Sequence, residues 1–151
     1  MTARPLTRSQ LARRIRQHVE VNLFDESGVD ADGIALYALA DPRDIRQTRY
    51  VGQTSLPQRR LLQHLNTARL WTPDADERPW WIKDPKLRPL YDWIRALYRD
   101  ECRLPTMVVF AWVSVAQARA AERASIYEAI TRRLPLLNVE AERGGAQLQL
   151  L

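Results

Sequence analysis

The chain has 151 residues, the size of one domain, and 46% of them are hydrophobic, an ordinary fraction for a globular protein. The net charge of +5 favours a polyanionic partner, no run approaches the ~18 apolar residues of a membrane span, and residues 1–16 lack the apolar core of a secretory signal. Cys102 is the only cysteine, which excludes an internal disulfide and favours the reducing cytoplasm.

The basic residues are almost all arginine: of 23, only Lys83 and Lys86 are lysine. Arginine presents a planar fork that grips phosphate oxygens in pairs. A GC-rich genome produces the same bias, however, so the arginine content alone does not decide between a phosphate-binding protein and any other.

The first third of the chain predicts a helix followed by a β-hairpin. A capping box begins at Thr7, and apolar residues recur every four positions, so a helix is expected over residues 7–22. After a loop at residues 25–33, the short apolar run Ile34–Ala40 predicts a strand. A polar connection over residues 41–48 then leads to a second strand, Arg49–Gln53.

The rest of the chain alternates between helical and extended patterns. Pro57 suits the first turn of a helix whose N-cap would be Ser55. The expected segments are a helix 57–70, an irregular segment 71–86, a helix 87–100, a buried strand 107–115, and a helix 116–133 that Pro135 stops.

This order predicts an α/β protein of the α+β kind. We expect a small, largely antiparallel three-stranded sheet flanked by helices, with an extra N-terminal helix. The expected organisation is an N-terminal helical extension (1–32), one main domain (33–142) and a flexible tail (143–151).

Arg60 and His64 are the first candidates for chemistry. They are four residues apart on one predicted helix, so they share a face near its N-terminus, where anions are favoured. The arginine could hold a phosphate, and the histidine could hold or move a proton near neutral pH. Each residue also has an ordinary interpretation, as a solvated surface arginine and a structural histidine.

Tyr37 and Tyr50 lie on the two arms of the predicted hairpin. Tyrosine is common in strands and at core edges, so packing is the default interpretation of each. Gly52 is more informative, because a glycine there allows the chain to leave the strand and allows a ligand or another backbone to approach closely.

Taken in order, these residues resemble the signature of the GIY-YIG nuclease superfamily over residues 33–140. Ala35-Leu36-Tyr37 stands in place of the first tripeptide and Tyr50-Val51-Gly52 in place of the second. Arg60, His64, Glu122 and Asn138 follow at the family's positions, the last within Leu136-Leu137-Asn138. The chain departs from the pattern in having Ala35-Leu36 where Gly-Ile is usual, which affects the backbone more than the tyrosine.

The resemblance implies hydrolysis of a phosphodiester in nucleic acid with one divalent cation, Mg²⁺ or Mn²⁺. It implies that Glu122 holds the metal, Arg60 holds the phosphate and Tyr37 activates or orients the attacking water. Tyr50 and His64 would complete a proton network. Arg59 and Gly52 are assigned to substrate binding or site structure, as is Asn138. Glu128 competes with Glu122 for the metal, but the family spacing favours Glu122.

Three functions are therefore considered. The first is a GIY-YIG-type endonuclease that acts on nucleic acid, with DNA favoured over RNA. For targeting it has only an N-terminal helix with Arg13, Arg14 and Arg16, so it is either weakly specific or dependent on a targeting protein partner or a homodimer. The second is a non-catalytic nucleic-acid-binding module with the same fold. The third is a basic scaffold whose tryptophans contact a protein. The pair Trp80-Trp81 stays open between base stacking and packing.

Overall fold

The computed structural model describes Thr7, residues 33–75 and residues 77–139. Three strands form one antiparallel sheet in the order β2-β1-β3: β1 (Ile34–Asp41), β2 (Asp44–Thr54) and β3 (Thr106–Val113). Three α-helices accompany it: α2 (Pro57–Leu70), α3 (Arg88–Glu101) and α4 (Val115–Thr131). The predicted α+β class and antiparallel sheet are confirmed. The predicted helix over residues 7–22 and the tail 143–151 lie outside the described residues.

The hairpin is tighter than the sequence predicts. β2 begins at Asp44, not at Arg49, so only two residues separate the strands. Its first residues, Asp44 to Gln47, are mostly polar and exposed, and of these only Asp44 has a register partner in β1, so no hydrophobic alternation predicts a strand there. The register shifts on either side of Ala40, and this bulge leaves Tyr50 opposite Leu39 and Gly52 opposite Tyr37. Those four residues therefore lie on one face of the sheet.

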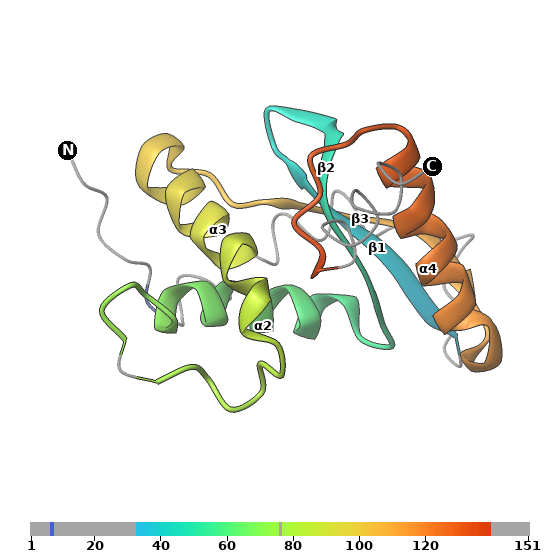
Figure 1. Ribbon diagram of the computed structural model, residues 1–151, viewed down its shortest axis with the longest axis horizontal. Helices are drawn as coiled ribbons and strands as arrows, with labels where there is room; N and C mark the ends of the chain where they lie inside the picture. Colours follow the sequence, from blue (N-terminus) through green and yellow to red (C-terminus); the bar gives the residue numbers. More distant parts are fainter. Residues whose placement is uncertain (1–6, 8–32, 76, 140–151) are drawn as a thin grey trace, which may run out of the picture.

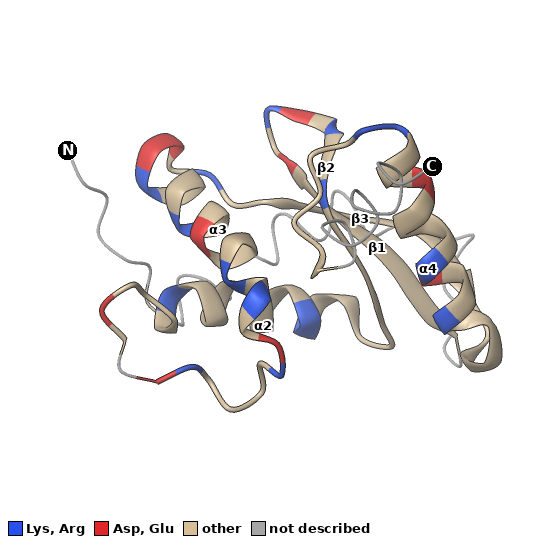
Figure 2. Ribbon diagram, viewed as in Figure 1, with Lys and Arg blue, Asp and Glu red and all other residues tan. Residues whose placement is uncertain are grey.

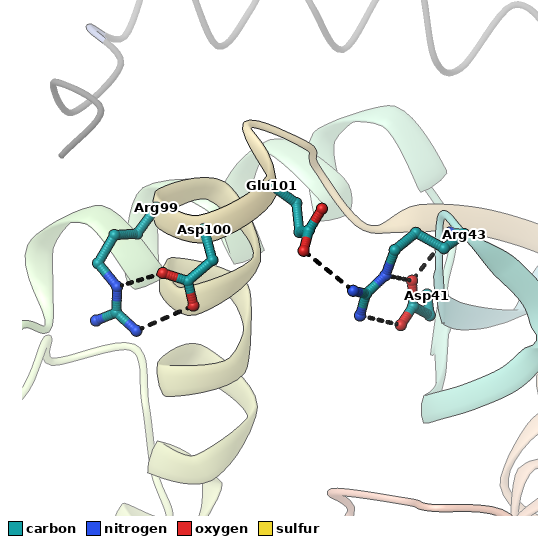
Figure 3. Close-up of polar contacts among 5 residues, drawn as sticks. All are labelled: Asp41, Arg43, Arg99, Asp100 and Glu101. Carbon is teal, nitrogen blue, oxygen red and sulfur yellow. Dashed lines mark hydrogen bonds and ion pairs between the residues drawn. The ribbon is translucent and has the colours of Figure 1, made fainter. Parts of the chain in front are cut away.

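An arginine joins the hairpin tip to the end of α3. The guanidinium of Arg43 binds the Asp41 carboxylate at 2.8 Å and reaches Glu101 at 3.3 Å, as Figure 3 shows. Arg99 and Asp100 form a separate pair on the last turn of α3 (Figure 3). Arg43, Arg99 and Asp100 are well exposed, so solvent screens these pairs and they add little to stability.

Helices cover both faces of the sheet (Figure 1). α2 and α3 pack together on one side, and α4 packs on β1 and β2 from the other. β1 is consequently buried on both faces over six consecutive residues. The main core lies between the sheet and the α2–α3 pair, and a short 3-10 helix, η2 (Pro85–Leu87), leads into α3. The central members of the main core are Tyr37, Leu39, Leu61, Leu65, Leu90, Tyr91 and Ile94.

Two local predictions were wrong. Ser55 does not cap α2; the N-cap position is Leu56, and its N–H is bound by the Thr54 hydroxyl at 3.1 Å. β3 is not buried throughout, because within the described residues it lies at the edge of the sheet, and Phe110 is 47% exposed. An apolar run identifies a strand but does not show whether the strand is central or at an edge.

The irregular segment 71–86 matches its prediction, and so do the bounds of α3 and α4 to within two residues. Among the described residues, no helix is long and apolar enough to cross a membrane.

Leu90 tests the packing of α3 against the sheet. It is fully buried in the main core, so Leu90→Ala should lower the free energy of unfolding by about 2–5 kcal/mol in urea titrations. Leu70→Ala, at the exposed end of α2, is the matched control and should change it by about 0.5 kcal/mol or less. Equal effects of the two variants would contradict the described packing.

Candidate active site

The phenol of Tyr37 lies over the backbone of Gly52. A Cβ at Gly52 would come within 2.6 Å of the Tyr37 hydroxyl and 2.9 Å of the Tyr50 ring. Such distances are closer than side chains tolerate, so only glycine leaves space for both tyrosines. We expected Gly52 to end the strand or to admit a ligand or another backbone. Instead it stays inside β2, and the group that approaches it is the Tyr37 ring.

Helix α2 brings Arg60 and His64 to the same phenol, which confirms that they share a face. Nε2 of His64 lies 2.7 Å from the Tyr37 hydroxyl, and Nε of Arg60 donates to that hydroxyl at 3.3 Å. The Tyr50 ring packs edge-on against His64, with 5.4 Å between ring centroids. Four of the predicted site residues therefore meet at one point between β1, β2 and α2.

A third tyrosine, Tyr91 of α3, completes this cluster and was missed by the sequence analysis. Its hydroxyl lies 3.2 Å from Nδ1 of His64, and its side chain is buried. Tyr91 occupies the apolar stripe of α3 beside Leu90 and Ile94, so it is indistinguishable from a packing residue in the sequence. The available signal is that a buried tyrosine hydroxyl needs a hydrogen-bond partner.

The donor-only guanidinium of Arg60 fixes the direction of the hydrogen bonds. A buried phenol proton needs an acceptor, and of the two polar partners of Tyr37 only His64 can accept. Nε2 of His64 is therefore unprotonated and Nδ1 carries the proton, which it donates to Tyr91. The proton donors run in one direction, from Arg60 through Tyr37 and His64 to Tyr91.

Burial determines the protonation of the cluster. Burial first, and then the charge of Arg60, lower the pKa of His64 well below its usual value of 6.5. This corrects the expectation that His64 holds a proton near neutral pH, because the ring is neutral there. Burial and the neighbouring Tyr50 raise the pKa of Tyr37, and Arg60 offsets this only in part, so the phenol keeps its proton.

Arg60 is half-buried and charged. Burial lowers its pKa, but its interactions with Tyr37 and the other two tyrosines outweigh that effect and raise the pKa overall. A second hydrogen bond, from its NH1 group to the side chain of Gln63, holds the guanidinium along the helix. Arg59, the neighbouring arginine on α2, is exposed. Of the two arginines, it is therefore Arg60 that joins the buried cluster.

Asn138 lies at the outer edge of β2 and binds the residue between Tyr50 and Gly52. Its Oδ1 accepts from the Val51 N–H at 2.9 Å, and its Nδ2 donates to the Val51 carbonyl at 2.8 Å. Leu137 adds a backbone hydrogen bond to the Arg49 carbonyl. Asn138 therefore holds the strand that carries the second tyrosine, in agreement with a role in site geometry.

The two candidate metal carboxylates differ in their surroundings. Glu122 is half-buried in the second turn of α4. Glu128 is exposed and pairs with Arg132 at 3.0 Å, so its carboxylate is directed to a surface ion pair. Within the described residues, no three His, Cys, Asp or Glu side chains gather as a metal site. The donors present fit only a sparse Mg²⁺ site, with one carboxylate and the remaining positions filled by water and phosphate oxygens.

Comparison with known protein families, with curated proteins and with solved structures found no match to this chain.

Gly52→Ala tests the space that Tyr37 occupies. The new methyl group should displace a phenol held by two hydrogen bonds and lower the free energy of unfolding by about 1–3 kcal/mol. The measurement is a urea titration in wild-type and Tyr37→Leu backgrounds. The cost should shrink when the ring is absent; the same cost in both backgrounds would show that Tyr37 is not what Gly52 accommodates.

The protonation of His64 can be read directly by ¹⁵N NMR. Nδ1 should be protonated, Nε2 unprotonated, and the signal should not titrate near pH 6.5. His18→Gln assigns the signal, because the chain has two histidines. The unfolded chain takes up a proton at this residue below pH 6.5 while the folded protein does not. Stability should therefore fall on acidification by up to about 1.4 kcal/mol per pH unit. An ordinary titration of His64 would contradict the buried, neutral ring.

Proposed function

We propose that the protein is a metal-dependent endonuclease of the GIY-YIG type that hydrolyses phosphodiester bonds in nucleic acid, DNA rather than RNA. The observation that carries the proposal is the meeting of Tyr37, Tyr50, Arg60 and His64 around one phenol hydroxyl. These residues come from two strands and a helix, and Gly52 provides the space for the phenol. Packing alone does not need a half-buried guanidinium that donates to a buried phenol, which is itself bonded to an imidazole.

Arg60 is the phosphate-binding group in this proposal. Its hydrogen bonds to Tyr37 and Gln63 use two of the five N–H groups of a guanidinium, which leaves donors for phosphate oxygens. α2 also contains three arginines and no carboxylate, and Figure 2 shows blue but no red along this helix. A phosphate at this helix would therefore meet positive charge without a competing anion on the same element.

Tyr37 would take the proton of the attacking water while passing its own to His64. The hydroxyl already points its hydrogen at Nε2 of His64, whose lone pair is free to accept it. A concerted transfer avoids a free phenolate, which the raised pKa of Tyr37 disfavours. Burial and the charge of Arg60 disfavour a protonated His64 as well, so the transfer depends on the negative charge that develops on the phosphate to offset the charge on the ring.

Glu122 would hold the divalent cation, Mg²⁺ or Mn²⁺, and Asn138 would fix the strand beside the site. When bound, the metal supplies charge stabilisation to the phosphate and the leaving oxygen. Basic residues are spread over α2, α3, α4, the hairpin and the loops of the described chain, mixed with carboxylates (Figure 2). A targeting partner or a second copy of the chain would supply further contacts. The exposed free thiol of Cys102 fits the reducing cytoplasm.

One observation favours a second function, a nucleic-acid-binding module without catalysis. Tyr37 is 0% exposed and His64 1% exposed, so a substrate could reach the phenol only after some rearrangement. In that function the cluster would be a structural polar core and the arginines would bind phosphate.

A cleavage assay separates the two functions. Wild type with plasmid DNA and Mg²⁺ should produce nicked or linear DNA, and EDTA should abolish this. Arg60→Gln and Glu122→Gln should each lower kcat by roughly 10²–10³-fold. Glu128→Gln is the matched control for Glu122→Gln, an exposed carboxylate on the same helix α4, and should cleave within a few-fold of wild type.

Three outcomes discriminate. Binding without cleavage of any DNA or RNA would favour the non-catalytic module. Cleavage by Glu122→Gln at the wild-type rate would remove Glu122 as the metal ligand. Neither binding nor cleavage at low salt would leave the scaffold function, since phosphate contacts are strongest there.

A further inference from the structure

Trp80 is the most exposed large hydrophobic side chain among the described residues, at 89%. It lies in the segment between α2 and α3, which loops out beyond α2 in Figure 1. A tight turn holds it: the N–H of Ile82 bonds to the Pro79 carbonyl at 3.0 Å, and Ile82 is buried. Trp80 is thus presented to solvent at the tip of an anchored turn, where an exposed indole is unusual.

The neighbouring Trp81 serves as a support for Trp80. The two indoles meet edge to face, with centroids 5.7 Å apart and an angle of 84° between planes. Trp81 packs against the main core, and its indole N–H donates to the Thr67 hydroxyl at 2.8 Å. The sequence left the roles of both tryptophans open. In the structure Trp81 is a packing residue, and Trp80 presents a free aromatic surface.

Hydrogen bonds connect this support to the candidate active site along α2. The Thr67 hydroxyl donates to the Gln63 carbonyl at 2.7 Å, and the Gln63 side chain holds Arg60. Residues 60 and 67 are seven apart, or about 10 Å along a helix axis. In a strand of a duplex, at about 3.4 Å per nucleotide, the distance between Arg60 and the residue that holds Trp81 corresponds to roughly three nucleotides.

Two cations lie beside Trp80 in a segment of mixed charge. Arg78 and Lys83 are exposed on either side of the tryptophan, and Glu77 and Asp84 are the next charged residues outward. A planar indole beside two cations offers a base a stacking surface and its phosphates a counter-charge. A base inside a duplex is already stacked on both sides, so this surface suits an unpaired base.

We propose that Trp80 stacks on an unpaired base of the nucleic acid, within a few nucleotides of the phosphate held by Arg60. The inference rests on the proposed function and narrows it, since the substrate would be a single strand or a duplex with an unpaired segment next to the cut. Trp81 and Thr67 position Trp80 and do not touch the nucleic acid.

The test is binding without cleavage, in EDTA, measured by fluorescence anisotropy on labelled oligo-thymidine and on a blunt duplex. Trp80→Leu should weaken binding to the single strand on the order of tenfold and leave the blunt duplex unchanged. Because no charge is lost, the dependence of affinity on salt should stay as in wild type. Trp80→Phe should recover most of the affinity, since it keeps an aromatic face.

Tyr127→Leu is the matched control, because it removes an exposed aromatic ring from α4, and it should bind as wild type. Wild-type affinity of Trp80→Leu for the single strand would overturn the stacking role, and so would an equal loss on the blunt duplex. If wild type cleaves plasmid DNA in the separate assay, either result overturns the stacking role alone. If wild type binds neither oligonucleotide, the stacking role and the proposed function fail together.

Discussion

The hydroxyl of Tyr37 is the point at which the sheet and its first helix are joined. It accepts a hydrogen bond from Arg60 and donates one to His64, so one oxygen links the central strand to two successive turns of α2. Burying a guanidinium and an imidazole is costly unless each finds a partner. The phenol supplies a partner to both. Gly52 supplies the space, and Tyr91 satisfies the far side of the imidazole. The position of α2 therefore depends on polar bonds as well as on apolar contact.

The sequence predicted the parts of the fold that depend on local pattern. α2 and α3 carry hydrophobic spacing that matches the helical period, β1 is a short apolar run, α4 is rich in alanine, and Pro57 marks the beginning of a helix. The first half of β2 was missed because it is mostly polar and exposed and its pairing with β1 is interrupted by a bulge, so no side-chain pattern marks it as a strand. The edge position of β3 was missed for a related reason, since strand order depends on contacts between distant segments.

The candidate site likewise has features that the sequence predicted and features that it missed. The spacing of Arg60 and His64 predicted one helical face, and the contacts of both with Tyr37 agree. Tyr91 lies 27 residues from His64 on another helix, so no local signal connects them. The neutral state of His64 also follows from burial, which composition and spacing do not report. The sequence thus indicated four of the five residues in the cluster, all but Tyr91. The burial and contacts of these side chains in the structure determine where each proton lies.

The side-chain amide of Asn138 acts as a peptide group at the open side of β2. By satisfying both backbone groups of Val51, it occupies the place where another strand would pair. The sheet therefore cannot be extended along that edge beside Tyr50 and Gly52. A second copy or a partner that adds a strand would have to do so elsewhere.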